Sequence, residues 1–206
     1  AQLSREILFD IYFERKDFER ALKVVNKLND ESLYNVDYIL DKVSVLAELS
    51  MNEEAKKQLG ILFGLAETDA RLLYEVAKWQ RIVSDFEGAD KSHQKLKTLV
   101  PDNLIVKVEA IRLLITKEQL DEAERRAKSL LVSTKNNPNV LGLLGDVYLA
   151  QQRPKSAFEQ YWKAIEIDSS FDLMAFKLYQ LAADGVNPEK VSQLLTRLKD
   201  ANPSQL

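Results

Sequence analysis

Few side chains in this sequence could act as a nucleophile, a general base or a soft metal ligand, because it contains one histidine and no cysteine. The histidine, His93, follows Ser92, and Lys95 completes the Ser-x-x-Lys spacing that some serine nucleophiles use. Such a nucleophile also needs the floor of a cleft and further partners, and the sequence identifies none. We therefore predict that His93 packs or forms a hydrogen bond and takes no part in catalysis.

Paired carboxylates are the second group with chemical potential, at Glu53-Glu54 and Asp121-Glu122. Acidic residues in the first turn of a helix are stabilised by its dipole, which is a sufficient structural reason for both pairs. A carboxylate-based, metal-dependent hydrolase is the enzymatic alternative. No convergent set of ligands supports it, so the sequence predicts no catalytic residue and no metal site.

A basic cluster at Arg125, Arg126 and Lys128 is interleaved with Glu122 and Glu124. Opposite charges three and four residues apart on a helix form ion pairs, so the pattern indicates a solvated helix face.

The few glycines do not follow a strand or form a phosphate-binding loop. The sequence thus predicts no cofactor.

Composition limits the classes of partner. The 206 residues are 46% hydrophobic and 30% charged, which is typical of a folded globular chain. With 29 Lys and Arg against 32 Asp and Glu, the net charge is −3, which argues against a general nucleic-acid or anionic-membrane binder. No apolar run approaches the roughly 20 residues that span a bilayer, so direct membrane insertion is not expected.

A 34-residue period positions all these residues. Alanine, replaced by valine in the last block, recurs at Ala21, Ala55, Ala89, Ala123, Ala157 and Val191. The period divides the chain into six blocks, 2–35, 36–69, 70–103, 104–137, 138–171 and 172–205. Apolar residues recur at three- and four-residue spacing in two runs per block, which predicts a helical hairpin. A small residue at a fixed place lets neighbouring helices approach closely.

The fifth block carries the clearest signature. Seven of its residues fall on signature positions of the tetratricopeptide repeat (TPR), which the chain resembles throughout: Leu141, Leu144, Gly145, Tyr148, Ala157, Tyr161 and Ala164. The resemblance implies an all-α, right-handed superhelical solenoid of six helix-turn-helix hairpins, forming one domain over 2–205. It also implies a non-catalytic scaffold that binds another protein or a peptide segment in a concave groove lined by the first helices.

The groove positions that the resemblance implies are unevenly charged. The first two blocks place acidic residues there, the next two mainly basic and apolar ones, and the fifth an acidic one: Glu6, Asp10, Glu14, Asp37, Glu48, Arg71, Tyr74, Lys78, Arg81, Val108, Arg112 and Asp146. We expect a partner segment that is basic toward the first repeats and acidic toward the middle. The alternative is that these are solvated faces of amphipathic helices.

One family mode of binding is disfavoured. TPR domains that hold chaperone C-termini use a carboxylate clamp that includes two asparagines. The corresponding ninth positions here are Asp10, Ser44, Lys78, Arg112, Asp146 and Gln180, with no asparagine pair.

The ends and the setting complete the expectations. The chain starts at Ala1 without an initiator methionine, so we expect a processed product or a piece of a longer protein, with a regulatory TPR portion of such a protein as the alternative function. An apolar terminal face is predicted at Leu194, Leu195 and Leu198, to be covered by further repeats, by a partner or by self-association. The last block resembles those of TPR proteins from bacterial envelope and exopolysaccharide-assembly systems. The sequence leaves the compartment open between cytoplasm and periplasm.

Overall fold

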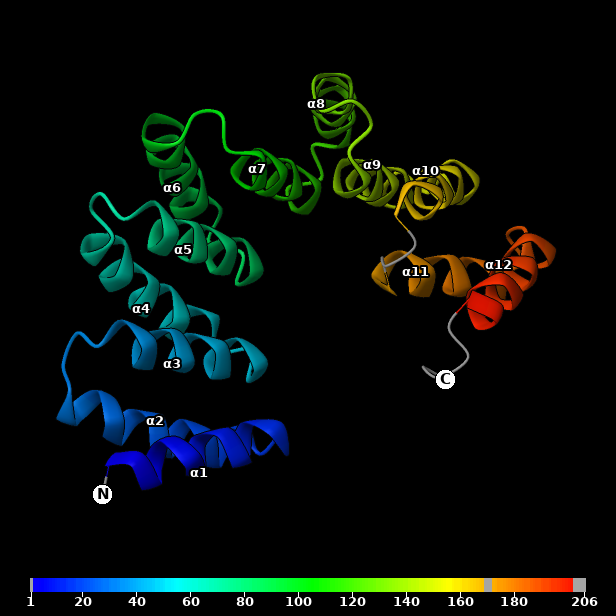
Figure 1. The fold of residues 1–206 in the computed structure, drawn as a ribbon. Coiled ribbons are helices and arrows are strands. Elements are labelled where there is room, and N and C mark those ends of the chain that lie inside the picture. The colour runs from blue at the N-terminus through cyan, green and yellow to red at the C-terminus, as the bar shows by residue number, and fades with distance from the viewer. Residues whose placement is uncertain (1, 169–171, 202–206) are drawn as a thin grey trace. The chain divides into compact units, whose positions relative to one another are not determined.

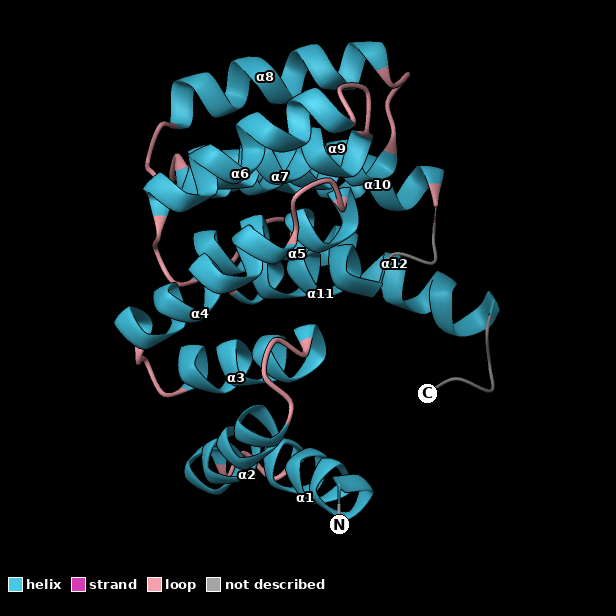
Figure 2. Cartoon of the chain, turned by 90° about the vertical axis from the view of Figure 1, so that its left-hand side faces the viewer, coloured by secondary structure: helices cyan, strands magenta, loops and turns pink. Residues whose placement is uncertain are grey.

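The chain is all-α in a computed structural model that describes residues 2–168 and 172–201 (Figure 1). Within those residues Figure 2 shows helices joined by loops and no strand. The helices are α1 (Gln2–Glu14), α2 (Phe18–Glu31), α3 (Val36–Glu48), α4 (Asn52–Leu65), α5 (Ala70–Ile82), α6 (Phe86–Leu99), α7 (Leu104–Thr116), α8 (Leu120–Ser133), α9 (Pro138–Ala150), α10 (Pro154–Ile167), α11 (Asp172–Ala183) and α12 (Pro188–Ala201).

Helix starts follow the sequence period. The first helix of each block begins at its first residue, and each second helix begins 16 residues after the first. Side-chain caps fix several starts: Asp17 accepts from the N–H of Arg20, Asn35 from that of Tyr38, and Asp85 from that of Gly88. The predicted hairpins are therefore confirmed.

The turn inside each of the first five hairpins has one geometry. Its central residue adopts a left-handed conformation, with φ between 57° and 59°, at Lys16, Ser50, Ser84, Glu118 and Gln152. The next N–H then donates back to a carbonyl of the first helix, as Asp85 does to Gln80 over 2.7 Å. This is the Schellman arrangement, which usually has glycine at the left-handed position.

The recurring small residues lie in the packed interior, as predicted. Ala21, Ala55, Ala89, Ala123 and Ala157 are fully buried, and Val191 is 3% exposed. Gly145 shows why size matters, since a Cβ atom there would lie 2.4 Å from Cε1 of Tyr161 on the facing helix. Close approach of α9 and α10 thus depends on a residue without a side chain.

The helices gather into two compact units, Ala1–Glu109 and Ala110–Leu206. In the first, α3 packs against α2, α4 and α5, and the core includes Val25, Val43, Leu59 and Val76. In the second, α10 packs against α9 and α11, and α11 against α12. The single domain expected over 2–205 stays a prediction.

Two further sequence expectations bear on the surface. No helix in residues 2–168 and 172–201 combines the length and the apolar character needed to cross a membrane. The side chains of Leu194, Leu195 and Leu198, on which terminal self-association was predicted, lie outside the described residues.

Candidate protein-interaction surface

Three aspartates from two helices interact electrostatically in the first unit. Asp10 lies on α1, whereas Asp37 and Asp41 lie one turn apart on α3. The charges of Asp10 and Asp37 both act on the carboxyl of Asp41, so the three groups lie within the range of their electrostatic interaction. Asp41 is half-buried, and the other two are exposed.

A hydrogen-bond network holds α1, α2 and α3 in this arrangement. Tyr38 is 6% exposed, and its hydroxyl donates to Oε1 of Glu6 on α1. Nδ2 of Asn29 on α2 donates to the carbonyl oxygens of Val25 and Tyr38, each at a distance of 3.0 Å. Position 38 therefore joins both helices of the first hairpin to α3, directly beside Asp37.

The electrostatics of the cluster are strained. Burial, followed by the charges of Asp10 and Asp37, raises the pKa of Asp41 from 3.8 to about 6. No lysine or arginine pairs with any of the three aspartates within the described part of the chain. An incoming cation would relieve this repulsion.

Two more predicted groove residues extend the cluster. Glu14 lies one turn beyond Asp10 on α1, and Glu48 lies two turns beyond Asp41 on α3, and both are exposed. We call Glu6, Asp10, Glu14, Asp37, Asp41 and Glu48 the acidic surface. Sequence reasoning missed Asp41, which falls on the sixth position of its repeat, outside the groove positions considered.

The predicted basic residues are largely neutralised within the unit. Nε of Arg81 lies 2.5 Å from Oε1 of Glu109, whose side chain is fully buried. Lys78 pairs with Glu75, one turn earlier on α5. Both cations already face a carboxylate of the same unit, so they are poorly placed to attract a partner.

The remaining groove residues differ from one another. Arg71 is exposed, and Tyr74 is half-buried. Val108 is only 9% exposed, so its side chain packs in the interior and does not line a surface. Arg112 is exposed but lies in the second unit.

Asp146 in the second unit serves an internal contact. The hydroxyl of Tyr161 donates to its Oδ1 over 2.6 Å, and Lys177 from α11 pairs with the same oxygen. The pKa of Tyr161 is raised by burial and by this carboxylate. Asp146 thus joins the fifth and sixth hairpins, which removes it from the proposed partner surface.

The structure separates the side chains of Ser92 and Lys95, which the Ser-x-x-Lys spacing had paired. The hydroxyl of Ser92 donates to Oε1 of the buried Gln80 over 2.6 Å, while the Lys95 ammonium lies over the ring of Phe63. Nδ1 of His93 lies 2.8 Å from the carbonyl oxygen of Ala89, which confirms its predicted hydrogen-bonding role. Among the described residues, no three His, Asp or Glu side chains lie together as metal ligands would.

The basic cluster on α8 is ion-paired, as predicted. Arg125 and Arg126 both bond Glu122, and Lys128 bonds Glu124. The hydrogen bond from Arg125, followed by that from Arg126, lowers the pKa of Glu122 to about 2. The cluster carries no evident anion site.

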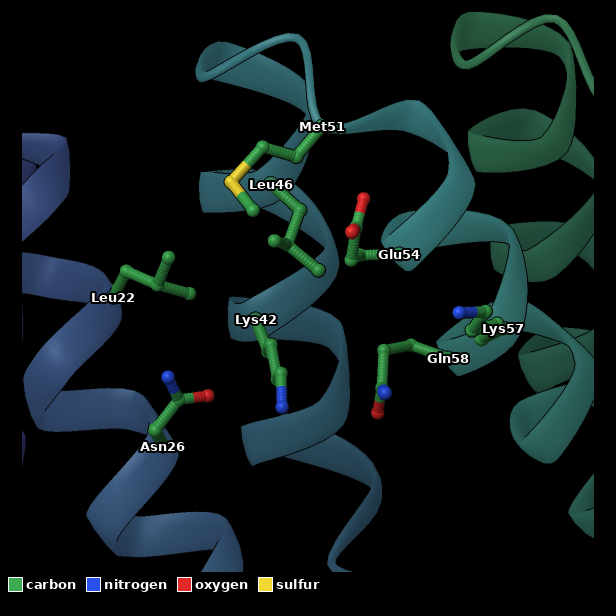
Figure 3. A pocket seen from close by; sticks show the side chains of 8 residues that line it. All are labelled: Leu22, Asn26, Lys42, Leu46, Met51, Glu54, Lys57 and Gln58. Carbon is green, nitrogen blue, oxygen red and sulfur yellow. The ribbon is translucent and has the colours of Figure 1, made fainter.

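A small hollow lies between α2, α3 and α4, with a volume of about 190 Å³ (Figure 3). Its walls mix apolar and polar side chains, among them Leu22, Leu46, Met51 and Lys42. Oδ1 of Asn26 is buried there and accepts no hydrogen bond within the described residues. Its size suits a few ordered waters or one side chain.

Comparison with solved structures decides the architecture. The chain is similar to a thermophilic TPR protein of Thermus thermophilus, with 15% identity over 89% of this chain and 100% of that one and a TM-score of 0.60. It is also similar to a tetratricopeptide repeat protein of Parabacteroides merdae, with 14% identity over 95% and 83% and a TM-score of 0.63. The chain has the tetratricopeptide-repeat fold.

A third TPR-like structure, pilF of Pseudomonas aeruginosa, is 15% identical over 100% of this chain and 93% of that one, with a TM-score of 0.56. No protein-family model matches the sequence, and no curated protein matches it. At these identities the likeness to TPR structures concerns the fold alone.

Proposed function

We propose that this protein is a non-catalytic interaction scaffold whose acidic surface binds a basic segment of another protein. TPR folds generally present helix faces to protein partners, and this chain shares that fold. The observation that carries the proposal is that the charges of Asp10 and Asp37 both act on Asp41 with no paired cation in the described residues. Close cations across the interface would stabilise all three carboxylates.

The contrast with the other charged residues supports this choice of surface. Arg81, Lys78 and Asp146 each have an internal partner of opposite charge. Asp10, Glu14, Asp37 and Glu48 of the acidic surface are exposed, and no salt bridge holds them within the described residues, whereas Arg71 is the exposed cation among the predicted groove residues of the same unit. The acidic half of the expected partner segment therefore has less support than the basic half.

The cellular process in which the protein takes part is inferred only from the sequence resemblance. A role in bacterial envelope or exopolysaccharide assembly, and the alternative of a regulatory TPR portion of a larger protein, stay predictions.

Fluorescence anisotropy with a labelled amphipathic peptide of lysine, arginine and leucine tests the proposal. The triple variant Asp10→Asn, Asp37→Asn, Asp41→Asn should weaken binding at least tenfold. A matched control, Glu19→Gln, Asp30→Asn, Glu67→Gln, removes the same charge from exposed positions of the same unit and should change affinity less than twofold. Equal weakening by both triple variants would mean that only net charge matters, and the proposed surface would be wrong.

A further inference from the structure

The loop that joins α2 to α3 (Figure 1) exposes two large apolar side chains. Leu33 is 75% exposed, and Tyr34 is 67% exposed. In the next three loops between hairpins, the equivalent pairs are polar or contain proline: Glu67-Thr68, Pro101-Asp102 and Lys135-Asn136. The apolar pair is therefore a feature of this loop and not of the repeat.

The fold gives no reason for a tyrosine in this loop. The backbone of Tyr34 is left-handed, with a φ of 67°, which bulky side chains disfavour and asparagine tolerates. Asn136 occupies the equivalent place in the fourth loop and has the same conformation, with a φ of 62°. An aromatic ring at position 34 thus serves neither the backbone conformation nor the packed interior, which leaves binding as its use.

The loop lies at one end of the acidic surface. Its last residue, Asn35, caps α3, and Asp37 follows in the first turn of that helix. On the other side of the loop, Glu31 at the end of α2 pairs with Arg5 on α1, the neighbour of Glu6 in sequence. The loop therefore adjoins the end of the acidic surface that carries Glu6 and Asp37.

The acidic surface extends from this end along α3. From Asp37 to Glu48 the helix advances about 17 Å, which is the length of about five residues of extended chain. A bound segment of that length can set its cations against the carboxylates along α1 and α3. Only one end of such a segment reaches Leu33 and Tyr34.

We propose that the basic segment bound by the acidic surface carries an apolar residue at one end, and that this residue packs on Leu33 and Tyr34. The inference rests on the proposed function, because the carboxylates bring the cationic part of the segment to this place. Burial of the exposed pair then adds affinity, and a tyrosine ring buries a large area at little cost in side-chain freedom. The partner is thus a short segment that is basic along its length and apolar at one end.

Three labelled peptides of equal charge test the inference by fluorescence anisotropy. Each contains the same stretch of alternating arginine and serine. One peptide has two leucines at its amino end, one has them at its carboxyl end, and the third has serines instead. One of the leucine peptides should bind the unaltered protein at least about fivefold more tightly than the serine peptide does, which also gives the chain direction of the bound segment.

The variant Leu33→Ser, Tyr34→Asn removes the apolar pair. It should reduce the gain from leucine to less than about twofold and leave the affinity for the serine peptide unchanged. Because asparagine suits the left-handed backbone, the variant should be at least as stable as the unaltered protein, which thermal unfolding checks. The matched control Ile61→Ser, Val132→Ser removes two exposed apolar side chains of α4 and α8 and should keep the full gain.

The possible outcomes separate this inference from the proposed function. No gain from leucine at either end, or a gain that persists in Leu33→Ser, Tyr34→Asn, would overturn the inference. The proposed function would still stand if the triple aspartate variant weakened binding of the serine peptide. A serine peptide that binds the triple variant as tightly as the unaltered protein would contradict both.

Discussion

The charge of Asp10 on α1 acts on Asp41 on α3, and with burial it raises the pKa of the half-buried Asp41 carboxyl to about 6. Burial is the larger cause, and the repulsion from Asp10 is the next. The folded state therefore binds a proton at Asp41 more tightly than the unfolded chain does. Near neutral pH the ionised group opposes folding, and this cost is tolerated at the surface proposed to bind a cationic partner.

Removing this charge should stabilise the protein. Because the folded pKa lies above the unfolded value of 3.8, stability is lost as pH rises from about 4 through 6. Asp41→Asn should raise the free energy of unfolding by about 1 to 2 kcal/mol at pH 8, after allowance for solvent screening, with no difference below about pH 4. Urea denaturation from pH 4 to 8 measures it, with the exposed Asp30→Asn as control. A destabilised Asp41→Asn variant at pH 8 would contradict this account.

The approach of α9 and α10 should depend on Gly145. Gly145→Ala places a methyl group against the buried ring of Tyr161, so we expect a loss of about 1 to 3 kcal/mol. Gly60→Ala, in the interior of α4 with no atom within 4 Å of the added carbon, should instead gain about 0.5 to 1 kcal/mol. Thermal unfolding of the two variants compares them directly. The same sign of effect in both would show that helix propensity, not packing, decides.

The left-handed turn of the second hairpin gives another test. Ser50 has a φ of 57°, a conformation that costs an L-residue about 1 kcal/mol and glycine much less. Ser50→Gly should therefore stabilise the chain by up to about 1 kcal/mol, whereas Ser50→Ala should not. Midpoints of chemical denaturation distinguish the two. A gain with alanine as large as that with glycine would point to a cause other than backbone conformation.

The repeat fold follows from the sequence because its determinants recur in register. The alanines at position 20 and the apolar spacing of each block identify the hairpins without any knowledge of long-range contacts. The left-handed turns were not predicted, because lysine, serine, glutamate and glutamine occupy the turn positions at which a glycine would have indicated this conformation.

The surface was less predictable, because charge neutralisation is a property of neighbouring repeats. Arg81 pairs with Glu109, and Asp146 pairs with Lys177, across 28 and 31 residues of sequence. A groove position alone does not reveal such a partner. The raised pKa of Asp41 likewise depends on burial and on Asp10 in the preceding repeat.

The pH dependence of basic-peptide binding tests the central claim most directly. If the peptide's cations lower the pKa of Asp41 from about 6 to about 4, its affinity should be about tenfold higher at pH 8 than at pH 5. In Asp41→Asn the ratio should fall below about twofold. A pH ratio that is the same in both proteins would contradict binding at the acidic surface.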